Sequence, residues 1–182
     1  LDGGVRAIQL REKDLEGGEL YALAAQLRDL TARYQARLLI NDRIDIALAV
    51  DADGVHLGQT SFPLSTAREL LGPDKLIGVS THSTPEIIAS SGADFIVFGP
   101  VYFTPSKAAY GEPQGLERLR EAVQHSSAPV FAIGGIQADR IAEIQAAGAH
   151  GIALISAISA ASDPRQAAKD LLAKLSARDQ AN

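Results

Sequence analysis

Short apolar segments alternate with longer amphipathic segments along almost the whole chain. The apolar segments are continuous and rich in Ile, Val, Leu and Phe, which is typical of strands buried on both faces of a parallel sheet. They predict strands at 7–11, 36–41, 54–58, 76–81, 95–101, 129–135 and 151–156. Apolar residues recur at helical spacing between them, most clearly at Leu20, Leu23, Leu27, Leu30 and Tyr34. Further helices are expected at 63–71, 85–91, 116–125, 138–147 and 164–175.

The junctions from helix to strand repeat one pattern. At 52–58, 92–99 and 148–155, a glycine lies where a helix ends and an apolar strand begins at once. Such repeats indicate βα units, arranged either as a (β/α)8 TIM barrel or as an open doubly wound sheet. No Gly-x-Gly-x-x-Gly follows a strand, which argues against a dinucleotide-binding fold. With no linker visible, we expect residues 1–182 to form a single domain.

The predicted strands are one fewer than a closed barrel of eight requires. The chain contains no methionine and starts at Leu1. We therefore expect the full-length polypeptide to have an upstream segment that supplies a further strand.

Composition argues against several function classes. A net charge of -5 is unfavourable for nucleic-acid binding, because binding to a phosphate backbone needs a basic face. No apolar run approaches the roughly 18 residues of a membrane span. The absence of cysteine excludes disulfides, thiol catalysis and thiolate metal sites, and fits a cytoplasmic protein.

Polar side chains gather where the first predicted strand ends. Because strand side chains alternate, Gln9, Arg11 and Lys13 are expected to point the same way. Two cations beside a core are costly without an anion, and a phosphate or diphosphate suits a guanidinium fork beside an ammonium group. The alternative is a strand end that frays into solvent.

The other strand ends are polar too, and barrel enzymes place catalytic residues at these ends. Asp42 could bind Mg²⁺ through a carboxylate, or Asn41 and Asp42 could cap the next helix. His82 could be a general acid or base, or a hydrogen-bonded histidine in a turn. Hydroxyls beside a lysine at 104–107, the glycine pair 134–135 and residues 155–156 suit phosphate binding.

The motifs at 9–13, 40–43, 54–59, 78–83, 98–107, 133–136 and 155–156 together resemble the thiamine phosphate synthase/TenI superfamily. The resemblance covers nearly the whole chain and implies a (β/α)8 barrel. It also implies a transferase that moves a hydroxymethylpyrimidine group from its diphosphate to a thiazole phosphate. The products would be thiamine phosphate and diphosphate.

The same resemblance implies roles for individual residues. The pyrimidine diphosphate would be bound by Gln9, Arg11, Lys13, Asn41, Ser80 and Lys107. Among these, Arg11, Ser80 and Lys107 would be catalytic. The thiazole phosphate would be bound by Thr104, Pro105, Ser106, Gly135, Ile155 and Ser156. Asp42 would bind Mg²⁺ as the cofactor. The expected partners are these two small substrates, and a second copy of the chain in a homodimer.

The chain departs from the family pattern in two places. An acidic residue, the second magnesium carboxylate, usually stands where this chain has Ser61. The first strand of the family, which ends in Thr-Asp, is missing. Two other functions therefore stay open beside the synthase. One is a thiazole tautomerase of the TenI type, which would use His82, and the other is a non-catalytic barrel that binds phosphate.

Overall fold

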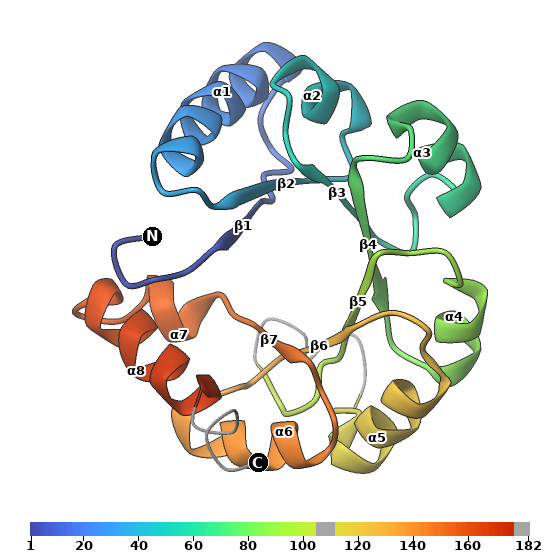
Figure 1. Cartoon of the computed structure of the whole chain (residues 1–182), viewed down its shortest axis with the longest axis vertical. Helices are drawn as coiled ribbons and strands as arrows, with labels where there is room; N and C mark the ends of the chain where they lie inside the picture. The colour runs from blue at the N-terminus through green and yellow to red at the C-terminus, as the bar shows by residue number, and fades with distance from the viewer. Residues whose placement is uncertain (105–111, 177–182) are drawn as a thin grey trace. The chain divides into compact units, whose positions relative to one another are not determined.

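Parallel strands alternate with helices along the chain, as the apolar pattern predicts (Figure 1). The computed structural model describes residues 1–104 and 112–176. Two compact units make up the chain. Unit 1 comprises Leu1 and Val5–Val79, and unit 2 comprises Asp2–Gly4 and Ser80–Asn182.

Unit 1 is built from parallel strands that pair in chain order. Its elements are β1 (Ala7–Leu10), α1 (Gly17–Arg33), β2 (Arg37–Asn41), α2 (Ile44–Ala49), β3 (Gly54–Leu57), α3 (Leu64–Leu71) and β4 (Leu76–Thr81), whose last two residues count with unit 2. Strand β1 pairs with β2, β2 with β3, and β3 with β4. Helices α1 and α2 lie side by side outside the strands (Figure 1). The carboxyl ends of these parallel strands therefore lie at one edge of the sheet, and their amino ends lie at the other.

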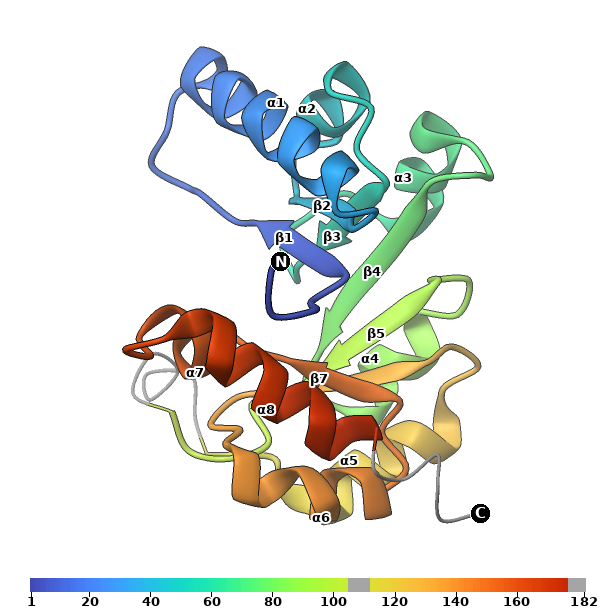
Figure 2. The ribbon, with the colours of Figure 1, turned by 60° about the vertical axis from the view of Figure 1, so that its left-hand side comes forward.

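Unit 2 repeats the same alternation with three further strands. Its elements are α4 (Thr84–Ala89), β5 (Phe95–Phe98), α5 (Gly115–His125), β6 (Val130–Ile133), η2 (Ala138–Arg140), α6 (Ile141–Ala146), β7 (Gly151–Ala153), α7 (Ser156–Ser159) and α8 (Pro164–Ser176). Strand β6 pairs in parallel with both β5 and β7. Helix α8 lies along α6 and α7 (Figure 2).

All the predicted strands are confirmed, and the main differences lie where three of them end. Strand β5 stops at Phe98 rather than 101, because Pro100 has no N–H to donate. Strand β6 stops at Ile133, before a pair of glycines with positive φ. The prediction of strand as far as Ser156 is wrong: β7 ends at Ala153 and Ser156 begins α7. The parallel α/β class is confirmed. The barrel of eight strands stays a prediction, since seven strands lie within the described residues.

Helix α1 shows how the core of unit 1 is built. Leu20, Ala24 and Thr31 are buried, and Leu27 packs partly against the same cluster. The spacing of 4, 3 and 4 residues along this line is that of one helix face. Leu30 is 41% exposed, so the prediction that it belongs to the buried face is wrong. The small Ala24 lies on the face instead, which lets α1 approach the strands closely.

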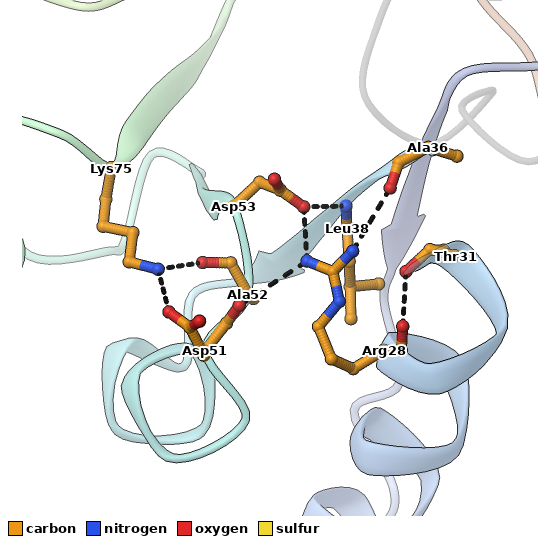
Figure 3. Close-up of polar contacts among 8 residues, drawn as sticks. All are labelled: Arg28, Thr31, Ala36, Leu38, Asp51, Ala52, Asp53 and Lys75. Carbon is orange, nitrogen blue, oxygen red and sulfur yellow. Dashed lines mark hydrogen bonds and ion pairs between the residues drawn. The ribbon is translucent and has the colours of Figure 1, made fainter. Parts of the chain in front are cut away.

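Charged side chains stabilise the amino edge of unit 1, where its strands begin (Figure 3). Arg28 on α1 lies 2.6 Å from Asp53 and donates to the Ala36 carbonyl at 3.3 Å. The same Asp53 carboxylate accepts from the backbone N–H of Leu38 at 2.7 Å. Burial by itself would raise the pKa of Asp53, but the Leu38 N–H and the Arg28 guanidinium outweigh it and lower that pKa. Helix α1 is thereby joined to the starts of β2 and β3.

Lys75 makes a second, more exposed link at this edge. Its ammonium group forms an ion pair with Asp51 and donates to the Ala52 carbonyl at 2.8 Å (Figure 3). The hydrogen bond from Lys75 lowers the pKa of Asp51. Lys75 lies directly before β4, so this link joins the start of β4 to the turn that precedes β3.

Residues 2–4 belong to unit 2, although Leu1 before them and the residues from Val5 onward belong to unit 1. Gly3 lies against α8: a Cβ atom on it would come within 2.6 Å of both the Ala168 side chain and the Arg165 carbonyl oxygen. A contact this short leaves no room for any side chain at residue 3. The chain therefore passes from unit 2 to unit 1 at residue 5, and returns to unit 2 at residue 80.

Candidate functional site

The ends of β1 and β2 carry a continuous line of polar side chains at the carboxyl edge of unit 1. Gln9 stands beside Leu39 in the parallel register, and its side-chain amide donates to Asn41 at 3.2 Å. The amide of Asn41 in turn donates to an oxygen of Asp42 at 2.8 Å. The structure thus brings together three residues that the sequence predicted to share a site, although Gln9 and Asn41 are 32 positions apart.

Asp42 adopts the left-handed backbone conformation, with φ of 60°. Its backbone N–H donates to the His56 carbonyl at 3.0 Å, which ties the end of β2 to β3. One carboxylate oxygen accepts from Asn41, and the other from the Gly58 N–H at 3.3 Å and from the Ser61 hydroxyl. The Gly58 N–H also donates to Ser61 Oγ at 2.6 Å. Ser61, which stands where the family usually has an acid, therefore contacts Asp42 directly.

This set of donors suits a hard cation. A carboxylate and a hydroxyl are oxygen ligands of the kind that Mg²⁺ takes, and Mg²⁺ commonly uses one or two carboxylates together with substrate phosphate oxygens. Within residues 1–104 and 112–176, no three His, Cys, Asp or Glu side chains form a cluster that could hold a metal ion. The residues present therefore fit a metal that takes most of its ligands from substrate and water.

Arg11 and Lys13 follow β1 and are both exposed. The strand ends at Leu10, so the predicted alternation of Gln9, Arg11 and Lys13 holds only as far as Gln9. Neither cation forms an ion pair with another described residue. By contrast Arg43, which follows Asp42, lies 2.6 Å from Asp45 and so has its charge engaged. Two unengaged cations beside a polar strand edge are available to bind an anionic ligand.

His56 lies in β3 and is only 6% exposed. Burial lowers the pKa of His56 to about 4, an effect that Asp42 opposes and Arg11 reinforces. The ring is therefore neutral at physiological pH. Since both Asp42 and Arg11 act on this histidine, both side chains lie near the same end of β3. This agrees with the prediction that Arg11 and Asp42 come together, and with a structural role for His56.

In unit 2, the end of β4 carries Ser80 and His82, both half-buried. Glu86, in the first turn of α4, accepts from the backbone N–H of His82 at 2.7 Å. Its carboxylate also lies 3.3 Å from Nδ1 of the His82 ring. Sequence analysis missed Glu86, although its spacing of four residues from His82 on a predicted helix was a usable signal. A carboxylate that orients a histidine is the usual support of a general acid or base.

The glycine pair after β6 lies in close contact with the segment that follows β5. Gly134 and Gly135 have φ of 99° and 62°. A Cβ atom on Gly135 would come within 2.5 Å of the Phe103 carbonyl oxygen and 2.8 Å of the Tyr102 Cβ. The Tyr102 N–H donates to the Gly134 carbonyl at 3.1 Å. Only glycine can therefore hold this turn, and Thr104 directly follows the contact.

Of the remaining residues that the sequence predicted for phosphate binding, the structure describes some and leaves others outside its described part. Ile155, 70% exposed, precedes α7, and Ser156 is the first residue of that helix. Pro105, Ser106 and Lys107 lie outside the described residues. Sequence analysis also missed Arg140 and Glu143, which contact Tyr102. Glu143 is 41 residues from Tyr102, and no local pattern connects them.

Among the helices of the part of the chain that the structure describes, none combines the length and apolar character needed to cross a membrane.

The fold and the strand ends together define a class of protein. It is an α/β protein of parallel strands, with amides, hydroxyls, cations and one carboxylate at the carboxyl ends of these strands. Comparison with known proteins narrows this class. The family model described as thiamine monophosphate synthase matches residues 1–158. The chain belongs to this family.

Individual relatives agree with the family match. A protein of Geobacter sulfurreducens, whose name proposes a thiamine-phosphate synthase, is 58% identical over 98% of this chain and 84% of its own length. A thiamine-phosphate synthase of Synechocystis is 49% identical over 97% of this chain, which spans 52% of that protein. The solved thiamine phosphate pyrophosphorylase of Pyrococcus furiosus superposes with a TM-score of 0.88 at 40% identity, over 97% of this chain and 85% of that one.

Proposed function

We propose that this protein is a thiamine-phosphate synthase, a transferase that joins a pyrimidine diphosphate to a thiazole phosphate. Membership of the family supports this proposal. The observation that carries it is the carboxyl edge of unit 1. There the hydrogen-bonded line of Gln9, Asn41 and Asp42 lies beside Arg11 and Lys13, whose charges are not neutralised by any described residue.

The chemistry requires a site that stabilises a leaving group. The bond between the pyrimidine methylene carbon and the diphosphate oxygen breaks, and the electron pair leaves with diphosphate. The thiazole ring nitrogen then attacks the carbon to form the new C–N bond. Negative charge grows on the diphosphate, so Arg11 and Lys13, with Ser80 and Lys107, would lower the barrier by charge and hydrogen bonds. No protein nucleophile is needed.

Magnesium is part of this proposal. Asp42 would be its carboxylate ligand, and the Ser61 hydroxyl, which contacts Asp42, would be a second oxygen ligand. When bound, the ion would neutralise charge on the diphosphate. The thiazole phosphate would be held by Thr104, Gly135, Ile155 and Ser156, with Pro105 and Ser106. A complete eight-stranded barrel, a single domain, a homodimer and a cytoplasmic location complete the proposal.

The direct test is release of diphosphate when the protein is mixed with the pyrimidine diphosphate, the thiazole phosphate and Mg²⁺. We expect release that requires all three components. Lys107→Ala should reduce turnover strongly, whereas Lys169→Ala, an exposed lysine on α8, is the matched control. Absence of release at every Mg²⁺ concentration would refute the synthase proposal, and an unchanged rate in Lys107→Ala would remove that lysine from the mechanism.

The metal assignment has its own test. Ser61→Asp should place a second carboxylate against Asp42 and tighten Mg²⁺ binding, as measured by calorimetric titration in the presence of diphosphate. Ser65→Asp, on the exposed side of α3, adds the same charge nearby and should leave the affinity unchanged. Equal affinity in Ser61→Asp and the original protein would show that residue 61 does not face the metal.

One observation favours a second candidate function, thiazole phosphate tautomerisation. His82 is oriented by Glu86, and a histidine held in this way could move a proton on the thiazole ring. A tautomerase, however, has no diphosphate to bind, so Arg11 and Lys13 would have no role in it. Isomerisation of the thiazole phosphate without any diphosphate release, abolished by His82→Ala, would select this second function.

A further inference from the structure

Tyr102, Arg140 and Glu143 form a connected group beside the glycine turn, which we call the Tyr102 clasp. The Tyr102 hydroxyl donates to the Glu143 carboxylate on α6. The Arg140 guanidinium carbon lies 4.4 Å from the centre of the Tyr102 ring, within the range of a cation–π interaction. Arg140 also donates to the Gly135 carbonyl at 2.6 Å. Three segments of unit 2 are thereby joined: the one after β5, the glycine turn after β6, and the start of α6.

The clasp acts on one backbone group in particular. In the planar trans peptide that follows Gly135, the carbonyl and the next N–H point in opposite directions. Because Arg140 holds the carbonyl on one side, the N–H of Ile136 is fixed toward the other side. A glycine turn without this contact could rotate its peptides, since glycine tolerates many backbone conformations.

The charges in the clasp explain why it persists. The phenol contacts groups of opposite charge, because Glu143 accepts from its hydroxyl and Arg140 lies over the face of its ring. Burial raises the pKa of Tyr102, and the hydrogen bond to Glu143 raises it further, so the phenol stays protonated and remains a donor across the physiological range. The two segments also pack closely, because a Cβ atom on Gly135 would come within 2.8 Å of the Tyr102 Cβ.

We infer that Tyr102, Arg140 and Glu143 are positioning residues that hold the Gly134–Gly135 turn in the one conformation that binds the phosphate of the thiazole substrate. This inference rests on the proposed function, and it adds residues that need not touch either substrate. A preorganised turn binds its anion without first losing backbone freedom, so loosening the turn should weaken binding of that ligand alone.

The test is to measure the affinity of each substrate separately by calorimetric titration. Arg140→Ala should raise the Kd for the thiazole phosphate about tenfold, the loss expected when one charged hydrogen bond to the turn is removed. The Kd for the pyrimidine diphosphate should stay within about twofold of the original value. Tyr102→Phe keeps the ring under Arg140 but loses the Glu143 contact, and should give a smaller rise of about threefold.

A matched control separates the clasp from a general loss of positive charge. Arg120 on α5 forms a surface ion pair with Glu117, so Arg120→Ala removes the same charge from unit 2. It should leave both affinities unchanged. Thermal unfolding of all variants serves as the check on folding, and Arg140→Lys should recover only part of the affinity, because an ammonium group lacks the planar fork.

The outcomes distinguish the clasp from the synthase proposal. If the original protein binds the thiazole phosphate but releases no diphosphate, the synthase proposal fails and the binding data still decide the clasp. If turnover is normal and Arg140→Ala binds the thiazole phosphate like the original, the clasp is refuted and the synthase stands. Equal losses for both substrates would also refute it, and a protein that binds no thiazole phosphate would overturn both.

Discussion

The two edges of the sheet in unit 1 differ in whether their cations form ion pairs. At the amino edge, Arg28 and Lys75 are paired with Asp53 and Asp51 (Figure 3). At the carboxyl edge, Arg11 forms no ion pair with any described residue, although Asp42 lies close enough to influence the same histidine. In βα proteins of this kind, the amino edge serves stability and the carboxyl edge serves function. The difference indicates that the paired cations at the amino edge have a structural role, and it supports the proposal that the unpaired Arg11 binds an anionic ligand.

Removing a cation from each edge should have opposite consequences, and the largest effect is expected at Arg11. If Arg11 stabilises the diphosphate leaving group as proposed, Arg11→Ala should lower kcat/KM for the pyrimidine diphosphate by about a thousandfold. Its unfolding midpoint should not change, since Arg11 is exposed. Steady-state kinetics and denaturant unfolding measure both quantities. A destabilised but fully active Arg11→Ala would reverse the comparison.

The next effect concerns pH and His56, which lies between the two edges. Its pKa falls from 6.5 to about 4 on folding, so the unfolded chain takes up this proton first as pH decreases. Stability from His56 is therefore full above pH 6.5, and declines until the pH reaches about 4, by about 3 kcal/mol.

Denaturant unfolding between pH 7 and pH 4, in metal-free buffer, measures this loss. His56→Gln should show a shallower decline than the original protein, because glutamine does not titrate. Identical slopes for the two proteins would mean that His56 accepts its proton in the folded state as readily as in the unfolded chain.

A smaller effect is expected from the half-buried Arg28–Asp53 link of the amino edge. Asp53→Ala leaves Arg28 and the Leu38 N–H without their acceptor, and should lower the free energy of unfolding by about 2 kcal/mol. The activity at saturating substrate should be retained at low temperature. Since folding lowers the pKa of Asp53, its contribution exists above its ordinary pKa and disappears as pH falls below it.

Lys75→Ala should have the smallest effect. Its partner Asp51 is exposed, and exposed ion pairs contribute little to stability and are screened by salt. We expect a loss smaller than that of Asp53→Ala, and one that decreases at high ionic strength. A loss independent of salt would assign the stabilisation to the hydrogen bond with the Ala52 carbonyl instead.

The sequence predicted most of this fold because its strongest signals are local. Each apolar segment was long enough to mark a strand, and parallel order followed from the helices between them. The polar strand ends then placed Gln9, Asn41 and Asp42 together, because parallel strands share one edge. The predictions were wrong where contacts with other parts of the chain decide whether a residue is buried or where a strand ends. Leu30 fits the helical spacing but lies outside the contact face, and Ser156 begins a helix although its strand was expected to reach it.

Contacts over long separations could not be predicted in this way. The Tyr102–Glu143 hydrogen bond joins residues with no shared periodicity, and it depends on how two segments after different strands come together. Ser61 was recognised as a departure from the family pattern, but only coordinates show its hydroxyl bonded to Asp42.

Gly3 has a consequence for anyone who wishes to divide this protein. Because Leu1 and Val5–Val79 count with the first unit and residues 2–4 with the second, the backbone crosses between the units three times, after residues 1, 4 and 79. A protease cut or gene split between Val79 and Ser80 would leave three residues of the later unit attached to the earlier fragment. Split reporters or circular permutants should therefore give residues 2–4 to the later fragment, where α8 provides the surface against which Gly3 fits.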